Sequence, residues 1–134
     1  MSNFPPEASP VKAIEGLEKA IPDGVLFAAL VGSRAKGQAR ADSDWDIAVL
    51  WKQMDALERI SRHEYLRREL AHALSVSEDK IDLIDLSNAG LAMRALVVEE
   101  GMLIVAHDQR AWCKFQERTW REVEEFYWEK SHAV

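Results

Sequence analysis

The chain has 134 residues, a length that predicts one domain. Its 17 Lys and Arg residues against 23 Asp and Glu residues give a net charge of −6, which argues against a broad basic face that holds duplex DNA or RNA. The one cysteine, Cys113, excludes an internal disulfide and a cysteine-based zinc site. The longest apolar run is too short to cross a bilayer and no signal peptide is visible, so we expect a cytoplasmic protein with no membrane association.

The first half of the chain predicts two strands separated by a polar loop. Proline-rich residues 1–10 predict a flexible N-terminal arm, and apolar residues at helical spacing follow from Val11 to Ile21. The continuous apolar run Val25 to Val31 is typical of a strand buried on both faces. Gly32 to Ser43 is small, polar and basic, which predicts a loop that begins with one helical turn. Strand character returns from Asp44 to Trp51.

The second half alternates helices and strands. An amphipathic pattern predicts a helix from Gln53 to Leu74, and Lys80 to Leu86 is strand-like. We expect Ser87 to cap a helix that ends at Glu100, then a short strand from Met102 to Ala106, then a long helix capped by Asp108 that runs toward Lys130. This alternation predicts an α/β (α+β) fold with a small mixed sheet and flanking helices, in a single domain of residues 11–134.

The loop after the first strand has the composition of an anion-binding site. Gly32 and Ser33 directly follow the buried strand, where glycine lets the backbone approach a ligand closely. A helical turn at that point would present free N–H groups to an anion. Arg34, Lys36 and Arg40 add a local positive patch to an acidic chain.

Two aspartates stand two positions apart on the second predicted strand. Side chains alternate along a strand, so Asp44 and Asp46 project to the same side, roughly 6–7 Å apart at Cα. Carboxylates in this arrangement suit one or two Mg²⁺ ions whose shells are completed by phosphates, the arrangement that clamps an in-line displacement at phosphorus. A third carboxylate on the next strand would be Asp82 or Asp85, which point to opposite faces, and alternation alone does not choose between them.

These residues resemble the signature of the minimal nucleotidyltransferases of the DNA polymerase β-like superfamily. That pattern has Gly-Ser, a further glycine and an Asp-x-Asp, matched here by Gly32, Ser33, Gly37, Asp44 and Asp46. Its third carboxylate lies in a segment like Lys80-Ile81-Asp82-Leu83-Ile84, so the resemblance favours Asp82. Trp45 is bulkier than the aliphatic residue expected between the two aspartates.

The whole chain is most similar to the antitoxins of HEPN–MNT toxin–antitoxin modules. The resemblance implies transfer of AMP from ATP to a tyrosine hydroxyl of a partner HEPN ribonuclease toxin by a two-metal mechanism with Mg²⁺. It implies catalytic and metal-binding roles for Asp44, Asp46 and Asp82. It also implies nucleotide binding by a group of five loop residues, Gly32, Ser33, Arg34, Lys36 and Gly37. A small domain has little surface left to hold an acceptor, and a protein acceptor would solve that problem.

Two other functions remain open at this point. One is nucleotidyl transfer to a small-molecule hydroxyl, as on an aminoglycoside, which would require dimerisation to complete the acceptor site. The other is a non-catalytic antitoxin that neutralises a toxin by contact alone, for which a degraded motif would be the sign. The sequence does not decide whether the chain assembles with itself or only with a partner.

Aromatic residues are frequent in the last predicted helix. Trp112, Phe115, Thr119, Val123 and Phe126 form one stripe that we expect to cover the core of this domain. Trp120 lies beside this stripe and Trp128 lies well off it. We expect both to contact a partner toxin or a second copy of the chain. By contrast, Arg67 and His72 are spaced as in HEPN ribonucleases, but the interleaved strands indicate that they belong to a polar helix face.

Overall fold

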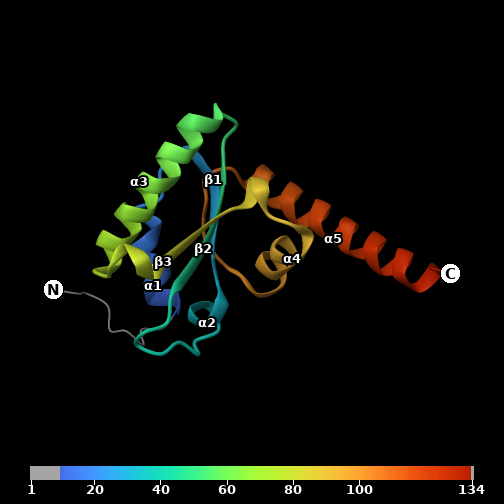
Figure 1. Cartoon of the computed structure of the whole chain (residues 1–134), viewed down its shortest axis with the longest axis horizontal. Coiled ribbons are helices and arrows are strands. Elements are labelled where there is room, and N and C mark those ends of the chain that lie inside the picture. Colours follow the sequence, from blue (N-terminus) through green and yellow to red (C-terminus); the bar gives the residue numbers. More distant parts are fainter. Residues whose placement is uncertain (1–9, 134) are drawn as a thin grey trace.

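The computed structural model describes residues 10–133, which form a single sheet with helices on both sides (Figure 1). The predicted arm therefore lies outside the described residues, except that the first helix already begins at Pro10. In chain order the elements are α1 (Pro10–Glu18), β1 (Val25–Val31), α2 (Gly32–Ala35), β2 (Trp45–Trp51), α3 (Ala56–Leu74), η1 (Glu78–Lys80), β3 (Ile81–Asp85), η2 (Leu86–Asn88), α4 (Leu91–Glu100), β4 (Met102–Ala106) and α5 (Gln109–His132).

The four strands form a mixed sheet in the order β3-β2-β1-β4. Strand β1 is antiparallel to both β2 and β4, whereas β2 and β3 are parallel. The parallel pair requires a long crossover, which α3 supplies. The predicted fold class, a small mixed sheet with flanking helices, is confirmed.

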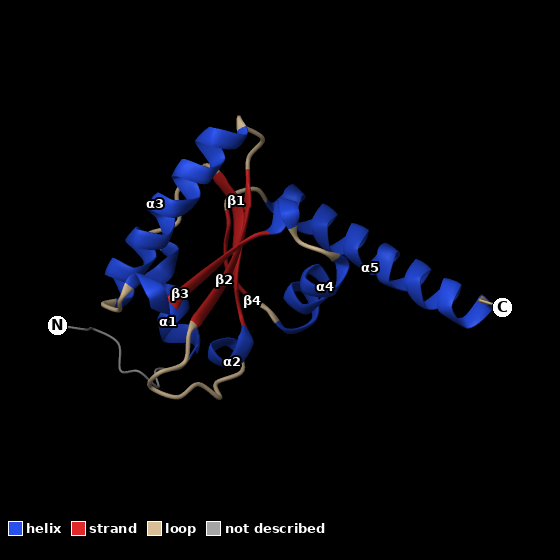
Figure 2. Cartoon of the chain, in the orientation of Figure 1, coloured by secondary structure: helices blue, strands red, loops and turns tan. Residues whose placement is uncertain are grey.

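Two helices cover each face of the sheet (Figure 2). Helices α1 and α3 bury Leu17 and Leu70 against one face, and α4 and α5 bury Val97 and Phe115 against the other. Strand β2 alternates between them, because Trp45 packs in the α1/α3 core and Ala48 in the α4/α5 core. Side chains two positions apart share a face, so Asp46 belongs to the α4/α5 side.

The predicted helix start at Ser87 is wrong. The Asp85 carboxylate accepts hydrogen bonds from the Ser87 backbone N–H at 3.1 Å and from its hydroxyl at 2.6 Å. These bonds favour the short 3₁₀ turn η2, and α4 begins four residues later, after Gly90. Ser87 thus caps nothing; it is itself held by an aspartate turn.

Two other helix boundaries also differ from the prediction. Helix α1 ends at Glu18 rather than Ile21, because the chain turns there through hydrogen bonds from Ala20 N to Leu17 O and from Ile21 N to Glu18 O. Helix α3 begins at Ala56 rather than Gln53, because Asp55 caps it through the Leu57 N–H at 3.2 Å. The start of α3 is thus set by the side-chain cap rather than by the first apolar residues of the periodic pattern.

Helix α5 packs on the sheet through only its first half. Asp108 caps it through the Ala111 N–H at 3.1 Å, as predicted. The Trp112 and Phe115 rings lie 4.9 Å and 5.1 Å from the Phe27 ring, centroid to centroid. The rest of α5 extends away from the sheet (Figure 1), and Phe126 is 45% exposed. The expectation that the whole stripe covers the core is therefore wrong beyond its first half.

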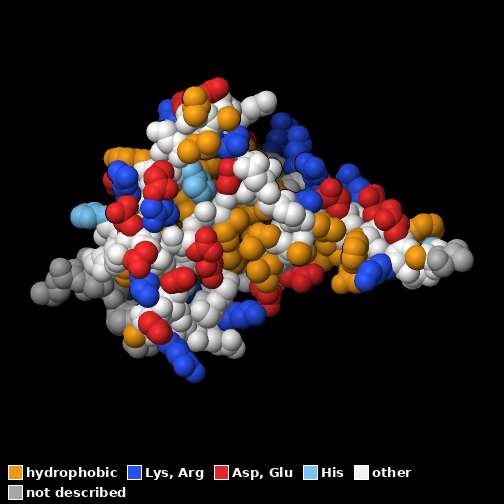
Figure 3. All heavy atoms as spheres, viewed as in Figure 1, with side chains coloured by type: hydrophobic (Ala, Val, Ile, Leu, Met, Phe, Trp, Pro, Cys, Tyr) orange, Lys and Arg blue, Asp and Glu red, His pale blue; other side chains and the backbone are white. Residues whose placement is uncertain are grey.

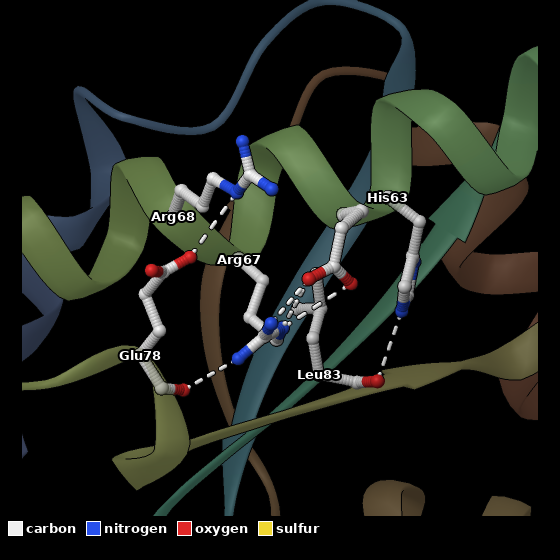
Figure 4. A network of polar contacts seen from close by, with 6 residues as sticks. His63, Arg67, Arg68, Glu78 and Leu83 are labelled. Carbon is white, nitrogen blue, oxygen red and sulfur yellow. Dashed lines mark hydrogen bonds and ion pairs between the residues drawn. The ribbon is translucent and has the colours of Figure 1, made fainter.

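Polar residues of α3 tie this helix to η1 and β3 (Figure 4). Arg67 donates to the Glu78 carbonyl at 2.6 Å and pairs with Glu64. His63 links the Trp51 indole N–H, at 3.0 Å, to the Leu83 carbonyl, at 2.9 Å. These contacts agree with the prediction that Arg67 belongs to a polar helix face. No helix among residues 10–133 has the length and apolarity needed to cross a membrane.

Candidate active site

The candidate site lies where β1 ends and β2 and β3 begin. Val31 pairs with Asp46 across the antiparallel strands, and Asp46 pairs with Asp82 across the parallel strands. The Gly32–Ala35 turn follows Val31 directly, so it stands beside the same carboxylates. The glycine loop and the predicted aspartates thus meet at one end of the strands of the sheet.

The carboxylates are close enough to perturb one another. The pKa of Asp46 is raised from 3.8 to about 6, first by burial and then by the negative charges of Asp82 and Asp44; a hydrogen bond with Asp82 acts in the same direction. Asp44 and Asp82 themselves are exposed. Like charges that raise a pKa in this way are the usual surroundings of a cation site or of acid–base chemistry.

The structure brings Asp82, and not Asp85, to this cluster. Asp85 instead pairs with the Arg59 Nε at 3.0 Å and accepts the hydrogen bonds of Ser87. Its charge is thereby engaged at the other end of β3. The sequence left these two aspartates undecided by alternation, and the strand register separates them.

Gly32 lets the loop approach the carboxylates. Its φ is +75°, a conformation that residues with a Cβ rarely adopt. A Cβ at this position would lie 2.4 Å from the Asp46 Oδ2. Gly37 also has a positive φ, +69°, but a Cβ there would meet nothing within 4 Å. Between them, the Lys36 N–H donates to the Gly32 carbonyl at 3.2 Å and closes the predicted helical turn.

The two predicted basic ligands of the loop lie in different surroundings. Lys36 is exposed and pairs with Glu100, at the end of α4, at 3.0 Å. Arg34 is buried, with 4% of its surface exposed, and its guanidinium lies over the Trp45 ring. Sequence reasoning missed the contacts with Glu100 and Trp45, because each joins elements whose packing no local pattern reveals.

The donor set suits a hard divalent cation that shares its ligands with phosphates. Asp44, Asp46 and Asp82 offer carboxylate oxygens, the ligands that Mg²⁺ prefers. Within residues 10–133, no group of three or more His, Cys, Asp or Glu side chains is arranged so that it could hold a metal ion without further ligands or movement of the carboxylates.

Removing one charge from the cluster is expected to stabilise the metal-free protein at high pH. The folded state binds the Asp46 proton more tightly than the unfolded chain, so stability falls as pH rises from about 4 through about 6. Asp82→Asn removes a neighbouring charge worth about 1 kcal/mol at this partly exposed site, so it should raise Tm by roughly 3–5 °C at pH 8. The difference in Tm between Asp82→Asn and the wild type should become smaller toward pH 4, where Asp46 is protonated in both. Thermal melts in the presence of a chelator measure it.

Asp85→Asn is the matched control on the same strand. It removes the ion pair with Arg59 and the bonds to Ser87, so it should lower Tm at pH 8. A Tm for Asp82→Asn that equals the wild-type value at pH 8 would contradict repulsion within the cluster.

The sequence of residues 12–110 matches the family described as "Polymerase beta, Nucleotidyltransferase". The chain is 29% identical over 93 residues to protein adenylyltransferase MntA of Aphanizomenon flos-aquae (strain 2012/KM1/D3), an alignment that covers 66% of this chain and 62% of that protein. It thus spans less than two thirds of the length of that relative.

Solved structures of toxin–antitoxin complexes share the fold. One is a crystal structure of a toxin–antitoxin with AMP-PNP, with 28% identity, a TM-score of 0.64, and coverage of 91% of this chain and 92% of that chain. Another contains the tri-AMPylated Shewanella oneidensis HEPN toxin in complex with MNT antitoxin, with 27% identity, a TM-score of 0.58, and coverage of 91% and 89%. From the match over residues 12–110, together with the mixed sheet and its loop, the chain belongs to the polymerase beta nucleotidyltransferase family.

Proposed function

We propose that this protein is an antitoxin that transfers AMP from ATP to a tyrosine hydroxyl of a partner HEPN ribonuclease toxin. The observation that carries the proposal is the convergence of Asp44, Asp46 and Asp82 beside the glycine loop. The intact Asp-x-Asp pair favours catalysis over neutralisation by contact alone. We take residues 11–134 as one catalytic domain.

The relatives support both the chemistry and the partner. One is named a protein adenylyltransferase, and another is bound to a HEPN toxin that carries three AMP groups. A further related toxin–antitoxin structure, 27% identical with a TM-score of 0.64, carries a double mutation of two aspartates two positions apart to glutamate. That spacing is the spacing of Asp44 and Asp46.

The loop would hold the triphosphate of ATP. The Ser33 hydroxyl and the backbone N–H groups after Gly32 can donate to phosphate oxygens, and Lys36 can exchange Glu100 for the leaving pyrophosphate. Asp44, Asp46 and Asp82 would hold two Mg²⁺ ions, whose charge neutralises the entering and leaving oxygens. Positioning and charge neutralisation then supply most of the rate enhancement.

The transfer itself exchanges one phosphorus–oxygen bond for another. The tyrosine oxygen attacks the α-phosphorus and forms a bond to it, while the bond from that phosphorus to the bridging oxygen breaks and pyrophosphate leaves. The proton of the hydroxyl passes to the Asp82 carboxylate, which is exposed and can release it to water.

Intact mass spectrometry of the partner tests this function directly. The chain is incubated with ATP, Mg²⁺ and the product of a neighbouring reading frame that encodes an all-helical HEPN protein, where there is one, and we expect one or more AMP additions on that partner. Peptide mapping should locate them on tyrosine. An unmodified partner that is still inhibited would instead indicate neutralisation by contact, and AMP on an added aminoglycoside would indicate a small-molecule acceptor.

The exposed half of α5 is the surface we propose for the partner. Figure 3 shows hydrophobic side chains gathered over α4 and along the outer part of α5. Trp120 is 40% exposed, Tyr127 66% and Trp128 61%. Between the two helices lies a groove of about 310 Å³, lined by Leu91, Ala92, Ala95, Glu99, Val123, Phe126 and Tyr127. Exposed aromatic side chains of this kind are typical centres of protein interfaces.

Trp128→Ala is expected to weaken binding of the HEPN partner by roughly 30-fold, the equivalent of about 2 kcal/mol at an interface centre. Trp120→Ala should have a smaller effect, because less of that side chain is exposed. Calorimetry or a pull-down measures both. Tyr65→Ala is the control, since Tyr65 is 64% exposed on α3, away from α5. Unchanged binding by Trp128→Ala would remove α5 from the interface.

A further inference from the structure

Arg34 lies on the opposite side of the sheet from the carboxylate cluster. Its guanidinium carbon is 4.2 Å from the centre of the Trp45 ring, and Trp45 packs in the α1/α3 core. Asp46, the next residue, projects to the α4/α5 side by strand alternation. Only 4% of Arg34 is exposed. In this conformation the Arg34 guanidinium therefore does not contact a phosphate that binds beside Asp46.

The Arg34 guanidinium also holds the end of the loop that precedes Asp44. Its Nη2 donates to the Ser43 carbonyl at 2.8 Å. The ammonium of Lys80, which directly precedes β3, lies 3.4 Å from the Asp42 carbonyl. The last two carbonyls before Asp44 thus each face a cation, one from α2 and one from the last residue of η1.

Asp44 directly follows the two residues whose carbonyls make these contacts. It precedes the first residue of β2, Trp45, and is itself exposed, so no strand pairing holds it directly. From these observations we infer that Arg34 is a positioning residue, which with Trp45 fixes the loop exit and thereby sets Asp44 relative to Asp46 and the nucleotide. The nucleotide-binding role that the family resemblance implies for Arg34 then falls to Lys36 alone among the basic residues of the turn.

The pairing also gives a reason for the bulky residue between the aspartates. A flat indole supplies a face on which a guanidinium stacks while its edge still donates a hydrogen bond. An aliphatic residue at position 45 would offer no such face. Lysine at position 34 would keep the charge but lose the planar stack and the defined direction of donation.

Transfer kinetics test the inference, in an assay that rests on the proposed function. We expect Arg34→Met to lower kcat about 10–100-fold, as displaced catalytic groups do, with KM for ATP within about 2-fold of wild type. Trp45→Leu should have a similar effect, the double variant should be little worse than either single variant, and Trp45→Phe should retain most activity. Lys36→Met is the matched control: it should mainly raise KM for ATP.

Hydrogen exchange provides a test that needs no transfer activity. In the nucleotide-free protein, Arg34→Met and Trp45→Leu should speed amide exchange in residues 36–44, whereas Lys36→Met should not. Arg34→Lys is a milder change, so its exchange rates should lie between those of the wild type and those of Arg34→Met. Loop exchange that stays at the wild-type rate in Arg34→Met and Arg34→Lys would overturn the inference. So would a rise in KM for ATP at unchanged kcat, because it would make Arg34 a phosphate ligand. If loop exchange changes but the wild-type protein transfers no AMP, the positioning role stands and the proposed function fails.

Discussion

Asp44→Asn and Asp46→Asn are each expected to lower AMP transfer by at least about 100–1,000-fold while the protein remains folded. Each change replaces a charged carboxylate by an amide, which is a much weaker ligand for Mg²⁺ and leaves phosphate charge unneutralised in the transition state. The fold should persist because Asp44 is exposed and precedes β2, and because removing a charge relieves repulsion within the carboxylate cluster. Labelled ATP measures transfer, and circular dichroism measures the fold.

Asp42→Asn is the control for this pair. Asp42 is an exposed aspartate of the same loop, and the contact it makes with Lys80 uses its backbone carbonyl rather than its carboxylate. This variant should transfer AMP at nearly the wild-type rate. Wild-type transfer by Asp44→Asn or Asp46→Asn would refute the assignment of these residues as metal ligands.

Strands were the most predictable part of the fold. The predicted strands Val25–Val31 and Met102–Ala106 have the observed bounds, because each is an uninterrupted apolar run ended by a change to glycine or polar residues. The predicted strands Asp44–Trp51 and Lys80–Leu86 are shorter in the structure, Trp45–Trp51 and Ile81–Asp85, because the residues at their ends belong to the loop and to the 3₁₀ turns. Helix starts were less predictable. They depend on single side-chain caps, and at Ser87 the aspartate two residues earlier forms a competing turn that apolar periodicity does not detect.

In the candidate site, too, local features could be predicted from the sequence and long-range contacts could not. The spacing of Asp44 and Asp46 is local, so strand alternation predicts a common face for them, although β2 begins at Trp45 and Asp44 lies just before it. The pairing of Asp82 with Asp46 depends on the register of two strands separated by a helix, and in the sequence only the resemblance to a family favours it. The stack of Arg34 on Trp45 crosses from a turn to the far face of the sheet, and no sequence period predicts such a contact.

The glycine loop yields the second large expected effect. Gly32→Ala should reduce AMP transfer by about 100-fold, in line with the effect of misplacing a catalytic group by about 1 Å. The added Cβ would lie 2.4 Å from the Asp46 Oδ2, so either the loop or the carboxylate must move. At a φ of +75° the substitution also strains the backbone by roughly 1–2 kcal/mol, which should lower Tm.

Gly37→Ala separates these two causes. Gly37 has nearly the same backbone conformation, with a φ of +69°, but an added Cβ there would have open space around it. This variant should therefore lose a similar amount of stability while its kcat/KM for AMP transfer stays within about 10-fold of wild type, because no catalytic group is displaced. If the two variants lose transfer activity equally, backbone strain alone accounts for the effect. The close approach of Gly32 to Asp46 would then have no special part in catalysis.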